Sequence, residues 1–353
     1  MSKRKAKQPD IKKMRVLVLV DSDLVPPDSL EGYTDKQILE WRTEYDVVTN
    51  LKKMGHDVQV LGVSDDLGKI RKEVDQWKPH IAFNLLEEFH GVAVYDQHVV
   101  SYLELLRQPY SGCNPRGLLL AHDKALCKQI LAYHRILTPK FVVCPLKRKV
   151  QTIRRLTYPL VVKSVSEEAS LGIARASIVT NEEKLKDRVA FMHDHVKSDA
   201  LIEEYIEGRE LYVAILGNQR LQTFPIWELQ FTKAGDNVPL IATAKVKWDE
   251  EYQKKLGVET KAAKDLSPEA AAAIVKQCVR TYRALFLTGY ARIDLRLSAD
   301  GRPYVLEANP NPNLTDGEDF SESAAAVGIG YQALLQRIMT LGRSYKAAWR
   351  SDA

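Results

Sequence analysis

The sequence A-R-I-D-L-R-L-S-A-D-G-R-P-Y-V-L-E-A-N-P-N-P-N, residues 291–313, contains two apolar strands joined by a short turn. The strands are expected at 291–297 and 303–307, and Ala-Asp-Gly at 299–301 is expected to turn the chain between them. After the second strand the sequence continues in a polar loop interrupted by prolines. Paired strands place their side chains next to one another, so the polar residues of this hairpin are the first candidates for a site.

Four polar side chains of the hairpin predict a site for phosphate and magnesium. Alternation along a strand puts Arg292 and Asp294 on one face, and Glu307 and Asn309 share a face of the returning segment. Asp294, Glu307 and Asn309 can therefore form one oxygen-rich cluster, the kind of ligand set that Mg²⁺ prefers. Arg292 beside them can offset phosphate charge. The alternative is an ion-pair hairpin on the surface, which the polar loop E-A-N-P-N-P-N disfavours.

Two lysines precede the hairpin. Lys124 stands at the start of an expected helix after His122-Asp123, and Lys163 ends the apolar strand 159–163. A lysine at a strand end can present its charge to a polyphosphate. Taken alone, each is typical of a surface lysine. Their order and their spacing to the carboxylates favour phosphate contacts.

The stretch I-E-E-Y-I-E-G-R-E, residues 202–210, reads as an apolar strand that ends in a glycine turn. Such a turn offers backbone N–H and C=O groups to the edge of an adenine. Glu203 could bind the adenine amino group and Glu210 the ribose hydroxyls. The bare pattern E-x-x-x-G-x-E is common in strand-turn-strand units, so it indicates a nucleotide only together with the other segments.

The N-terminal third alternates strands and helices. Strands are expected at 15–20, 56–63 and 80–86, a short one near Tyr110, and helices at 35–54, 67–77 and 97–107. This order is typical of a doubly wound α/β unit, in which ligand-contacting residues lie beyond the carboxyl ends of the strands. The first strand is followed by D-S-D-L-V-P-P rather than G-x-G-x-x-G, which argues against a dinucleotide-dependent oxidoreductase.

The rest of the chain suggests two further units. A helix at 123–133 and strands at 141–144, 158–164, 178–179 and 200–205 indicate a small α+β lid. A strand at 211–216, the hairpin, and helices at 268–286 and 328–344 follow. We therefore predict a disordered basic tail at 1–13, an N-terminal α/β unit at 14–118, a central unit at 119–208, a C-terminal unit at 209–345 and a tail at 346–353.

Together these segments resemble the ATP-grasp superfamily and, within it, the D-alanine–D-alanine ligases. The resemblance covers residues 14 to about 341 and rests on Lys124, Lys163, and the motifs E-E-Y-I-E-G-R-E (203–210), R-I-D (292–294), E-A-N-P (307–310), F-N-L-L (83–86), P-Y-S-G (109–112) and H-D-K (122–124). It implies a three-subdomain ATP-grasp fold, α/β with an α+β character in the ATP-grasp part, with an N-terminal Rossmann-like doubly wound domain.

The resemblance also implies roles for individual residues. ATP phosphates and the adenine pocket would be contacted by Lys124 and Lys163, and adenine and ribose by Glu203, Tyr205, Ile206 and Glu210. Two Mg²⁺ ions, with Mn²⁺ as an alternative, would be bound by Asp294, Glu307 and Asn309. Arg292 and Lys245 would face the transferred phosphate, and Ser170 would lie in the loop that closes over it.

The substrate half departs from the family. Ala169 stands where a substrate-orienting serine is usual, Val246 where a tyrosine is usual, and Glu87 where a histidine is expected. Glu318 and Asp319 replace a serine and a leucine that would meet the carboxylate of the second substrate. Two acids repel a carboxylate and favour an ammonium or guanidinium group. Glu44 is a candidate for the glutamate that orients the first substrate's amine, or else an ordinary helix residue.

The expected activity is ATP-dependent carboxylate–amine ligation through an acyl phosphate. The alternatives are a ligase of other amino acids or of a natural-product precursor, and an ATP-binding regulator without catalysis. The net charge of +5 comes without a basic stripe, so no nucleic-acid partner is expected. The sequence has no run of about 18 apolar residues, so no membrane span is expected. Four scattered cysteines favour a reducing cytoplasm, and the family suggests a homodimer.

Overall fold

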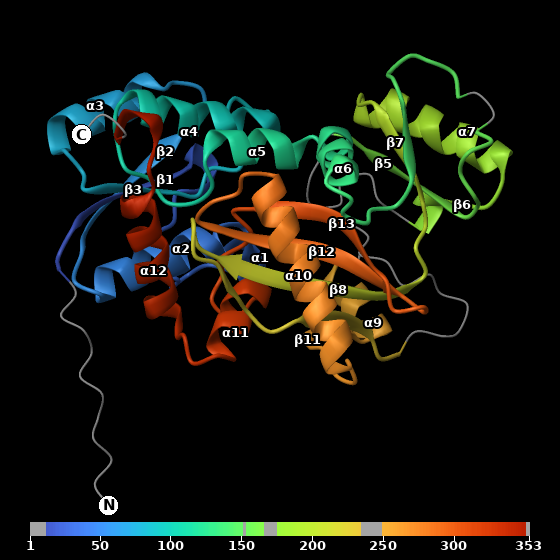
Figure 1. Ribbon diagram of the computed structural model, residues 1–353. Coiled ribbons are helices and arrows are strands. Elements are labelled where there is room, and N and C mark those ends of the chain that lie inside the picture. Colours follow the sequence, from blue (N-terminus) through green and yellow to red (C-terminus); the bar gives the residue numbers. More distant parts are fainter. Residues whose placement is uncertain (1–11, 151–152, 166–174, 234–248, 351–353) are drawn as a thin grey trace, which may run out of the picture.

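The computed structural model describes residues 12–150, 153–165, 175–233 and 249–350, which fold around three sheets (Figure 1). The first sheet is parallel, with the order β2-β1-β3. Its strands are β1 (Arg15–Asp21), β2 (Asp57–Val63) and β3 (Ile81–Asn84). The apolar run of β1 is buried on both faces, as expected for a central parallel strand.

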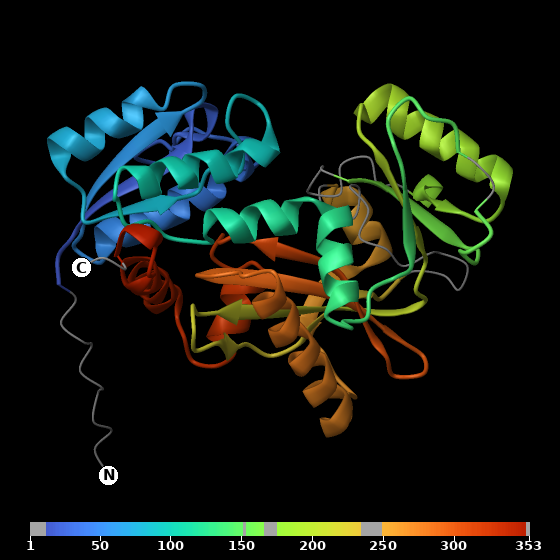
Figure 2. The same cartoon turned by 45° about the horizontal axis from the view of Figure 1, so that its top comes forward.

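Helices cover both faces of this first sheet. On one face, α3 (Gly68–Trp77) and α4 (Asp96–Leu105) pack against Leu17 and Leu19. On the other, α2 (Arg42–Lys53) and the C-terminal α12 (Tyr331–Ser344) pack against Val16 and Val18. Figures 1 and 2 show α12, in red, beside the blue N-terminal elements. The doubly wound arrangement is therefore completed by a helix from the far end of the chain.

The single helix expected at 35–54 is wrong, because the chain forms α1 (Asp35–Glu40) and then α2, with a break at Trp41. Trp41 is buried, and its ring contacts those of Tyr33 and Tyr45 at centroid distances of 5.3 and 5.9 Å. Packing of the large ring outweighs continuation of the helix at this position. The expected strand near Tyr110 is an isolated bridge to Ala82.

The second sheet has the order β4-β7-β5-β6, and its pairs are antiparallel. It consists of β4 (Phe141–Cys144), β5 (Leu160–Ser164), β6 (Ile178–Val179) and β7 (Ala200–Glu204). The helix α7 (Glu182–Phe191), which the sequence did not suggest, packs on the face that carries Ile202 and Val162. Glu203 and Lys163, one residue along each strand, consequently face the opposite side.

The third sheet has the order β11-β10-β8-β12-β13, with β9 (Gln222–Thr223) on β8. Its longer strands are β8 (Gly208–Leu216), β10 (Trp227–Phe231), β11 (Val258–Ala262), β12 (Tyr290–Ser298) and β13 (Pro303–Pro310). The helix α10 (Pro268–Ala284) packs through Ile274 and Cys278 on the face that carries Val213 and Ile293. The other face carries the charged residues of the hairpin.

Four shorter helices connect these layers: α5 (Pro115–His122), α6 (Lys124–Tyr133), α9 (Glu250–Leu256) and α11 (Asp319–Ala325). Phe320 of α11 packs with Phe224 and Tyr290, so the end of the charged face meets the N-terminal unit. The division of the chain into units stays a prediction. No helix in the described ranges is long and apolar enough to cross a membrane.

All four cysteines are buried and free, as expected for small apolar residues. Burial raises the pKa of Cys113 and of Cys127 to about 12. These thiols are therefore protonated at neutral pH and poor nucleophiles.

Candidate nucleotide and metal site

The hairpin of β12 and β13 brings its four polar residues to one face. Arg292 lies opposite Asn309, and Asp294 lies opposite Glu307. The Arg292 guanidinium donates from Nε to Oδ1 of Asp294 at 2.8 Å and from Nη2 to Oδ2 at 2.9 Å. Asp294 is almost completely buried. The shared face that the sequence predicts is therefore confirmed, although its roles in binding remain predictions.

A β-bulge decides which residues of β13 face this cluster. Between Asp294 and Leu295 the register shifts, so that Val305 pairs with Leu295 while Glu307 pairs with Asp294. Strict alternation would have put Val305 and Glu307 on the same face. The bulge lets Val305 join the apolar core while Glu307 and Asn309 turn to the charged face.

The donors of this face fit a magnesium ion only together with other oxygens. Within the described ranges no group of three or more His, Cys, Asp or Glu side chains could hold a metal ion. The set consists of two carboxylates and the Asn309 amide, whose Nδ2 is buried and has no hydrogen-bond partner among the described residues. Such an amide can turn its oxygen to an ion at little cost. Mg²⁺ commonly combines a few protein oxygens with phosphate oxygens and water.

The neighbouring strand β8 extends the charged face. Glu210 lies opposite Arg296, and Tyr212 lies opposite Asp294. Arg296 Nη2 donates to Oε2 of Glu210 at 2.7 Å, and the Tyr212 hydroxyl donates to Oε1 at 3.1 Å. The Arg292 guanidinium lies 4.7 Å from the centroid of the Tyr212 ring. Tyr212 therefore connects Glu210 with the Arg292–Asp294 pair.

Glu203 is held between two lysines. Its Oε1 lies 2.7 Å from Lys163 Nζ, and its Oε2 lies 2.8 Å from Lys128 Nζ. Burial alone raises the pKa of Glu203, but the attraction of both ammonium groups outweighs it, so the pKa is lowered. Lys128 also donates to the Thr138 hydroxyl at 2.8 Å. The carboxylate is thus ionised at neutral pH and held on both oxygens.

Lys163 links the second and third sheets electrostatically. Burial on its own lowers the pKa of Lys163, but the attraction of Glu203 and then of Glu307 and Glu210 more than offsets it, and the pKa is raised. Glu307 and Glu210 belong to the third sheet, whereas Lys163 belongs to the second. The predicted phosphate residue Lys163 therefore lies within electrostatic range of the predicted adenine, ribose and metal residues Glu203, Glu210 and Glu307.

The remaining residues that are predicted to contact the nucleotide lie next to these strands. Tyr205 and Ile206 lie in the segment that joins β7 to β8, and the Tyr205 backbone N–H donates to the carbonyl of Pro159 at 3.0 Å. Lys124 is buried in the first turn of α6, after Asp123, whose Oδ1 accepts from the N–H groups of Ala125 and Leu126. Lys124 N–H donates to the Val165 carbonyl, which ties α6 to the end of β5.

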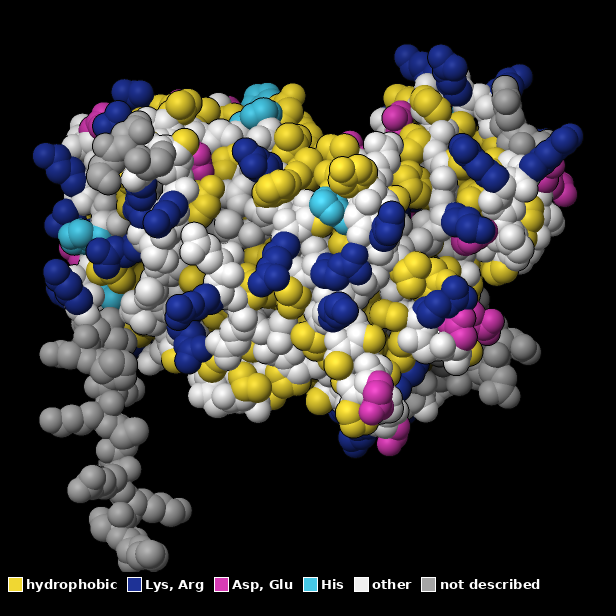
Figure 3. Space-filling view, in the orientation of Figure 1, with side chains coloured by type: hydrophobic (Ala, Val, Ile, Leu, Met, Phe, Trp, Pro, Cys, Tyr) yellow, Lys and Arg dark blue, Asp and Glu magenta, His cyan; other side chains and the backbone are white. Residues whose placement is uncertain are grey.

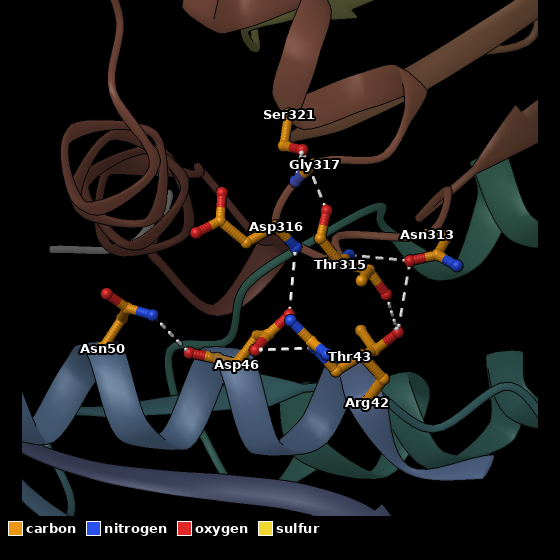
Figure 4. A network of polar contacts seen from close by, with 9 residues as sticks. All are labelled: Arg42, Thr43, Asp46, Asn50, Asn313, Thr315, Asp316, Gly317 and Ser321. Atoms are coloured by element: carbon orange, nitrogen blue, oxygen red, sulfur yellow. Dashed lines mark hydrogen bonds and ion pairs between the residues drawn. The ribbon is translucent and has the colours of Figure 1, made fainter. Parts of the chain in front are cut away.

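A polar network joins α2 to the loop after β13 (Figure 4), and three of the predicted substrate residues, Glu44, Glu318 and Asp319, are near it in the sequence. Thr43 contacts Asn313 and Thr315 at 3.1 and 2.7 Å, and the Asp316 N–H donates to Oδ2 of Asp46 at 3.2 Å. This network fixes the loop that leads to Glu318 and Asp319.

Glu44, between Thr43 and Asp46 on α2, is buried. Burial raises the pKa of Glu44 to about 7. A hydrogen bond to the backbone of Glu44 itself partly offsets this effect, and the charge of Asp21 adds to it. Asp319 Oδ2 lies 3.6 Å from Nη1 of Arg292. Burial and the charge of Asp319 raise the pKa of Glu318, and Arg292 partly offsets this. Glu87, after β3, is exposed.

Ser170 and Lys245 lie outside the described residues, as do Ala169 and Val246. Three residues that sequence reasoning missed belong to the site: Lys128, Tyr212 and Arg296. Lys128 is four residues after Lys124, hence on the same side of α6, and Tyr212 and Arg296 continue the alternation of Glu210 and Asp294. Extending the helical spacing from Lys124 and the strand alternation from Glu210 and Asp294 by one step would have identified all three residues.

A separate cavity of about 460 Å³ lies in the central unit. Its lining contains Lys147, Arg148, Lys149, Lys186, Val189, His193 and Lys197. Figure 3 shows dark-blue Lys and Arg side chains around this lobe, at the upper right. Val189 belongs to α7, on the face of the second sheet opposite Glu203. This cavity is therefore distinct from the candidate nucleotide site.

Comparison with known proteins shows which family the chain resembles. The family described as D-ala D-ala ligase C-terminus matches residues 129–340. A D-alanine–D-alanine ligase of Bordetella petrii is 32% identical over 255 residues, which is 71% of this chain and 73% of the relative. An uncharacterised protein of Sinorhizobium fredii is 31% identical over 73% of each chain.

Solved structures of D-alanine–D-alanine ligases and of a related ligase resemble the chain in fold. The D-alanine–D-alanine ligase of Bacillus anthracis, complexed with ATP, is 25% identical with a TM-score of 0.72, covering 93% of this chain and 97% of that one. A D-Ala:D-Ser ligase of Enterococcus faecalis, 19% identical with a TM-score of 0.67, covers 94% of this chain and 100% of that one, and shares its fold. The expected ATP-grasp fold is confirmed, and the chain belongs to the D-alanine–D-alanine ligase family.

Proposed function

We propose that this chain is an ATP-dependent carboxylate–amine ligase that forms an amide bond through an acyl phosphate. One observation carries the proposal, in a chain of this family: Lys163, paired with Glu203 on one sheet, is attracted by Glu307 and Glu210 of another sheet, whose same face carries the Arg292–Asp294 pair. Such a set matches what phosphoryl transfer needs, because its catalysis is mainly positioning and charge neutralisation. A related structure that contains ATP supports ATP as the nucleotide.

The residues would divide the work between the two ends of the nucleotide. Glu203, Tyr205, Ile206 and Glu210 hold the base and ribose, and Lys124 and Lys163 contact the phosphates. Asp294, Glu307 and Asn309 would hold Mg²⁺, two ions in our proposal, with Mn²⁺ as a substitute. The ions would supply charge neutralisation at the phosphate oxygens. Arg292 faces the transferred phosphoryl group, as does Lys245, and Ser170 belongs to the covering loop.

The reaction joins a carboxylate and an amine. A carboxylate oxygen attacks the γ-phosphorus, the bond to the β-phosphate oxygen breaks, and ADP leaves with that bond's electron pair. The amine then attacks the acyl carbon, phosphate leaves, and the amine loses a proton. Arg292, already held by Asp294 and near Asp319, can stay in place during both steps. Water must be kept out, because it would hydrolyse the acyl phosphate.

The acceptor amine is proposed to carry a second positive charge. Glu318 and Asp319 lie where a carboxylate-binding serine and leucine are usual, and Asp319 is half-buried next to the exposed Glu318. Changing Glu318 to Gln is expected to lower kcat/KM for lysine or ornithine by about 10- to 100-fold and to leave alanine almost unaffected, because a charged hydrogen bond contributes about 1.5–3 kcal/mol.

The test compares kcat/KM for these acceptors at saturating ATP, with Glu322→Gln on the exposed side of α11 as the matched control. An equal loss of kcat/KM for lysine and alanine would show that Glu318 does not line the acceptor pocket.

Glu44 is proposed to receive the amine of the first substrate. Its pKa in the folded chain, about 7, exceeds the ordinary value of 4.5, so its contribution to stability is greatest below pH 4.5 and is lost as the pH rises through 7. Glu44→Gln should therefore leave stability unchanged near pH 4 and increase the free energy of unfolding by roughly 3 kcal/mol at pH 8.

Urea unfolding at the two pH values measures this difference, with the exposed Glu40→Gln as control. The same gain at both pH values would show that the carboxyl does not titrate near neutrality. The variant should also raise KM for the first substrate at pH 8.

The first experiment is ADP release from Mg·ATP with D- and L-amino acids, singly and in pairs, with mass spectrometry of the products. D-Alanyl-D-alanine would identify a cell-wall ligase, and a product from other acids or cationic amines would identify a related ligase. ATP binding without turnover across the panel favours the second candidate, a regulator without catalysis. The carboxylates of the hairpin argue against this, since a regulator needs no metal ligands.

We further propose a cytoplasmic location and a homodimer.

A further inference from the structure

Arg296 is the charged residue of this face that the proposed reaction does not use. It is 2% exposed and belongs to β12, two residues beyond Asp294. Its guanidinium donates to Glu210 and Tyr205 side chains, at 2.7 and 3.1 Å. It also donates to the carbonyls of Ile206 and Gly208, each at 3.4 Å. All four partners lie in the segment proposed to bind the base and ribose.

Arg296 and Tyr212 together orient the Glu210 carboxylate. Arg296 occupies Oε2, and the Tyr212 hydroxyl occupies Oε1. An ionised carboxylate has about four acceptor positions, two on each oxygen. One position on each oxygen therefore stays available, with the carboxylate plane fixed. Two acceptors side by side match two neighbouring hydroxyl donors, the arrangement that a ribose presents through its 2′ and 3′ hydroxyls.

Without Arg296 the same carboxylate would lose its fixed orientation. Glu210 is buried, and Arg296 is its ion-pair partner in the described part of the chain. A buried carboxylate without that cation would rotate toward water or another donor, so its two free acceptor positions would no longer face one diol. The ring of Tyr205, 5.1 Å from the guanidinium carbon, and the two carbonyls fix Arg296 in turn.

We propose that Arg296 is a positioning residue that makes the nucleotide site select a ribonucleotide over its 2′-deoxy analogue, by orienting Glu210 toward the 2′ and 3′ hydroxyls. This inference rests on the proposed ATP site. The site would select by hydrogen bonding, because the analogue that lacks one hydroxyl leaves an acceptor of Glu210 unpaired.

The test measures the equilibrium binding of ATP and of 2′-deoxyATP to the full chain by calorimetry, with Mg²⁺ present and amino acids absent. The unaltered chain should bind ATP about 10- to 100-fold more tightly than 2′-deoxyATP. Arg296→Met should bring this ratio close to 1, mainly by weakening ATP, with 2′-deoxyATP changed little. Arg296→Lys, which keeps the charge but loses the planar fork, should restore only part of the ratio.

Three further comparisons guard against a loss of folding. Tyr212→Phe removes a single hydroxyl and should lower the ratio by a smaller factor. In a Glu210→Gln background, Arg296→Met should cause no additional change in the ratio. Arg302→Met, in the exposed Asp300–Arg302 pair of the same hairpin, is the matched control and should keep the full ratio.

The outcomes separate this inference from the proposed function. If Arg296→Met binds ATP and keeps the ratio of the unaltered chain, or if the unaltered chain does not distinguish the two nucleotides, Arg296 has no such role and the ligase proposal stands. If the unaltered chain binds neither nucleotide, both proposals fail.

Discussion

Asp294→Asn is expected to lower the rate of ADP release by at least about 100- to 1000-fold, the range typical of removing one preorganised charged group. The change removes the charge that Arg292 holds in two hydrogen bonds and weakens the oxygen cluster with Glu307 and Asn309. Asn has nearly the same shape as Asp, but it removes the countercharge of the buried Arg292, so stability should also fall and kcat is compared for the folded fraction. Glu307→Gln should act in the same direction.

The measurement is ADP release over a range of Mg²⁺ concentrations, with circular dichroism to verify folding. Asp300→Asn is the matched control, because Asp300 lies in the turn of the same hairpin and pairs with the exposed Arg302. It should keep nearly full activity. Unchanged ADP release in both Asp294→Asn and Glu307→Gln would contradict the proposed metal site.

Glu203→Gln is expected to reduce the free energy of unfolding by about 3–5 kcal/mol at pH 7, the range found when one partner of a buried ion pair is removed. The substitution removes the carboxylate that lies between Lys128 and Lys163, and Lys128 is 1% exposed. Urea unfolding measures the effect. Glu204→Gln, on the adjacent residue with the more distant Lys140 pair at 4.0 Å, should cost less than about 1 kcal/mol.

The effect of Glu203→Gln should depend on pH. The pKa of Glu203 is lowered in the folded chain, so the carboxylate contributes its stability above the ordinary value of 4.5 and loses it as the pH falls through the folded pKa. The difference between the unaltered chain and the variant should therefore shrink below pH 4.5. A difference that stays constant down to pH 3 would mean that Glu203 stays protonated or is held by other contacts.

Several features of this site follow from local periodicity. Alternation with a period of two placed Arg292 with Asp294, and the apolar strand before Lys163 placed that lysine at a strand end. The continuous apolar run of β1 predicted a central parallel strand. These inferences succeed because strand geometry depends on neighbouring residues only.

Other features need contacts between distant segments. The break at Trp41 depends on ring contacts with Tyr33 and Tyr45, which a helical pattern does not reveal. Helix α11 was missed because its buried residue Phe320 packs on Phe224 and Tyr290 rather than on a local partner. The loop after β13 is fixed by Thr43 and Asp46 of α2, some 270 residues away.

The sequence by itself determined the chemistry available to this protein: a carboxylate–arginine hairpin, two lysines and a glycine turn with flanking acids. It did so because residue type and strand alternation are local properties. Only the tertiary structure decided how these groups are paired. The bulge that separates Val305 from Glu307 arises in the pairing of β12 with β13. The position of Glu203 between Lys128 and Lys163 and the ion pair of Arg296 with Glu210 arise where segments distant in the sequence meet. Burial at those meeting points makes each charge require a partner, and the fold selects which one.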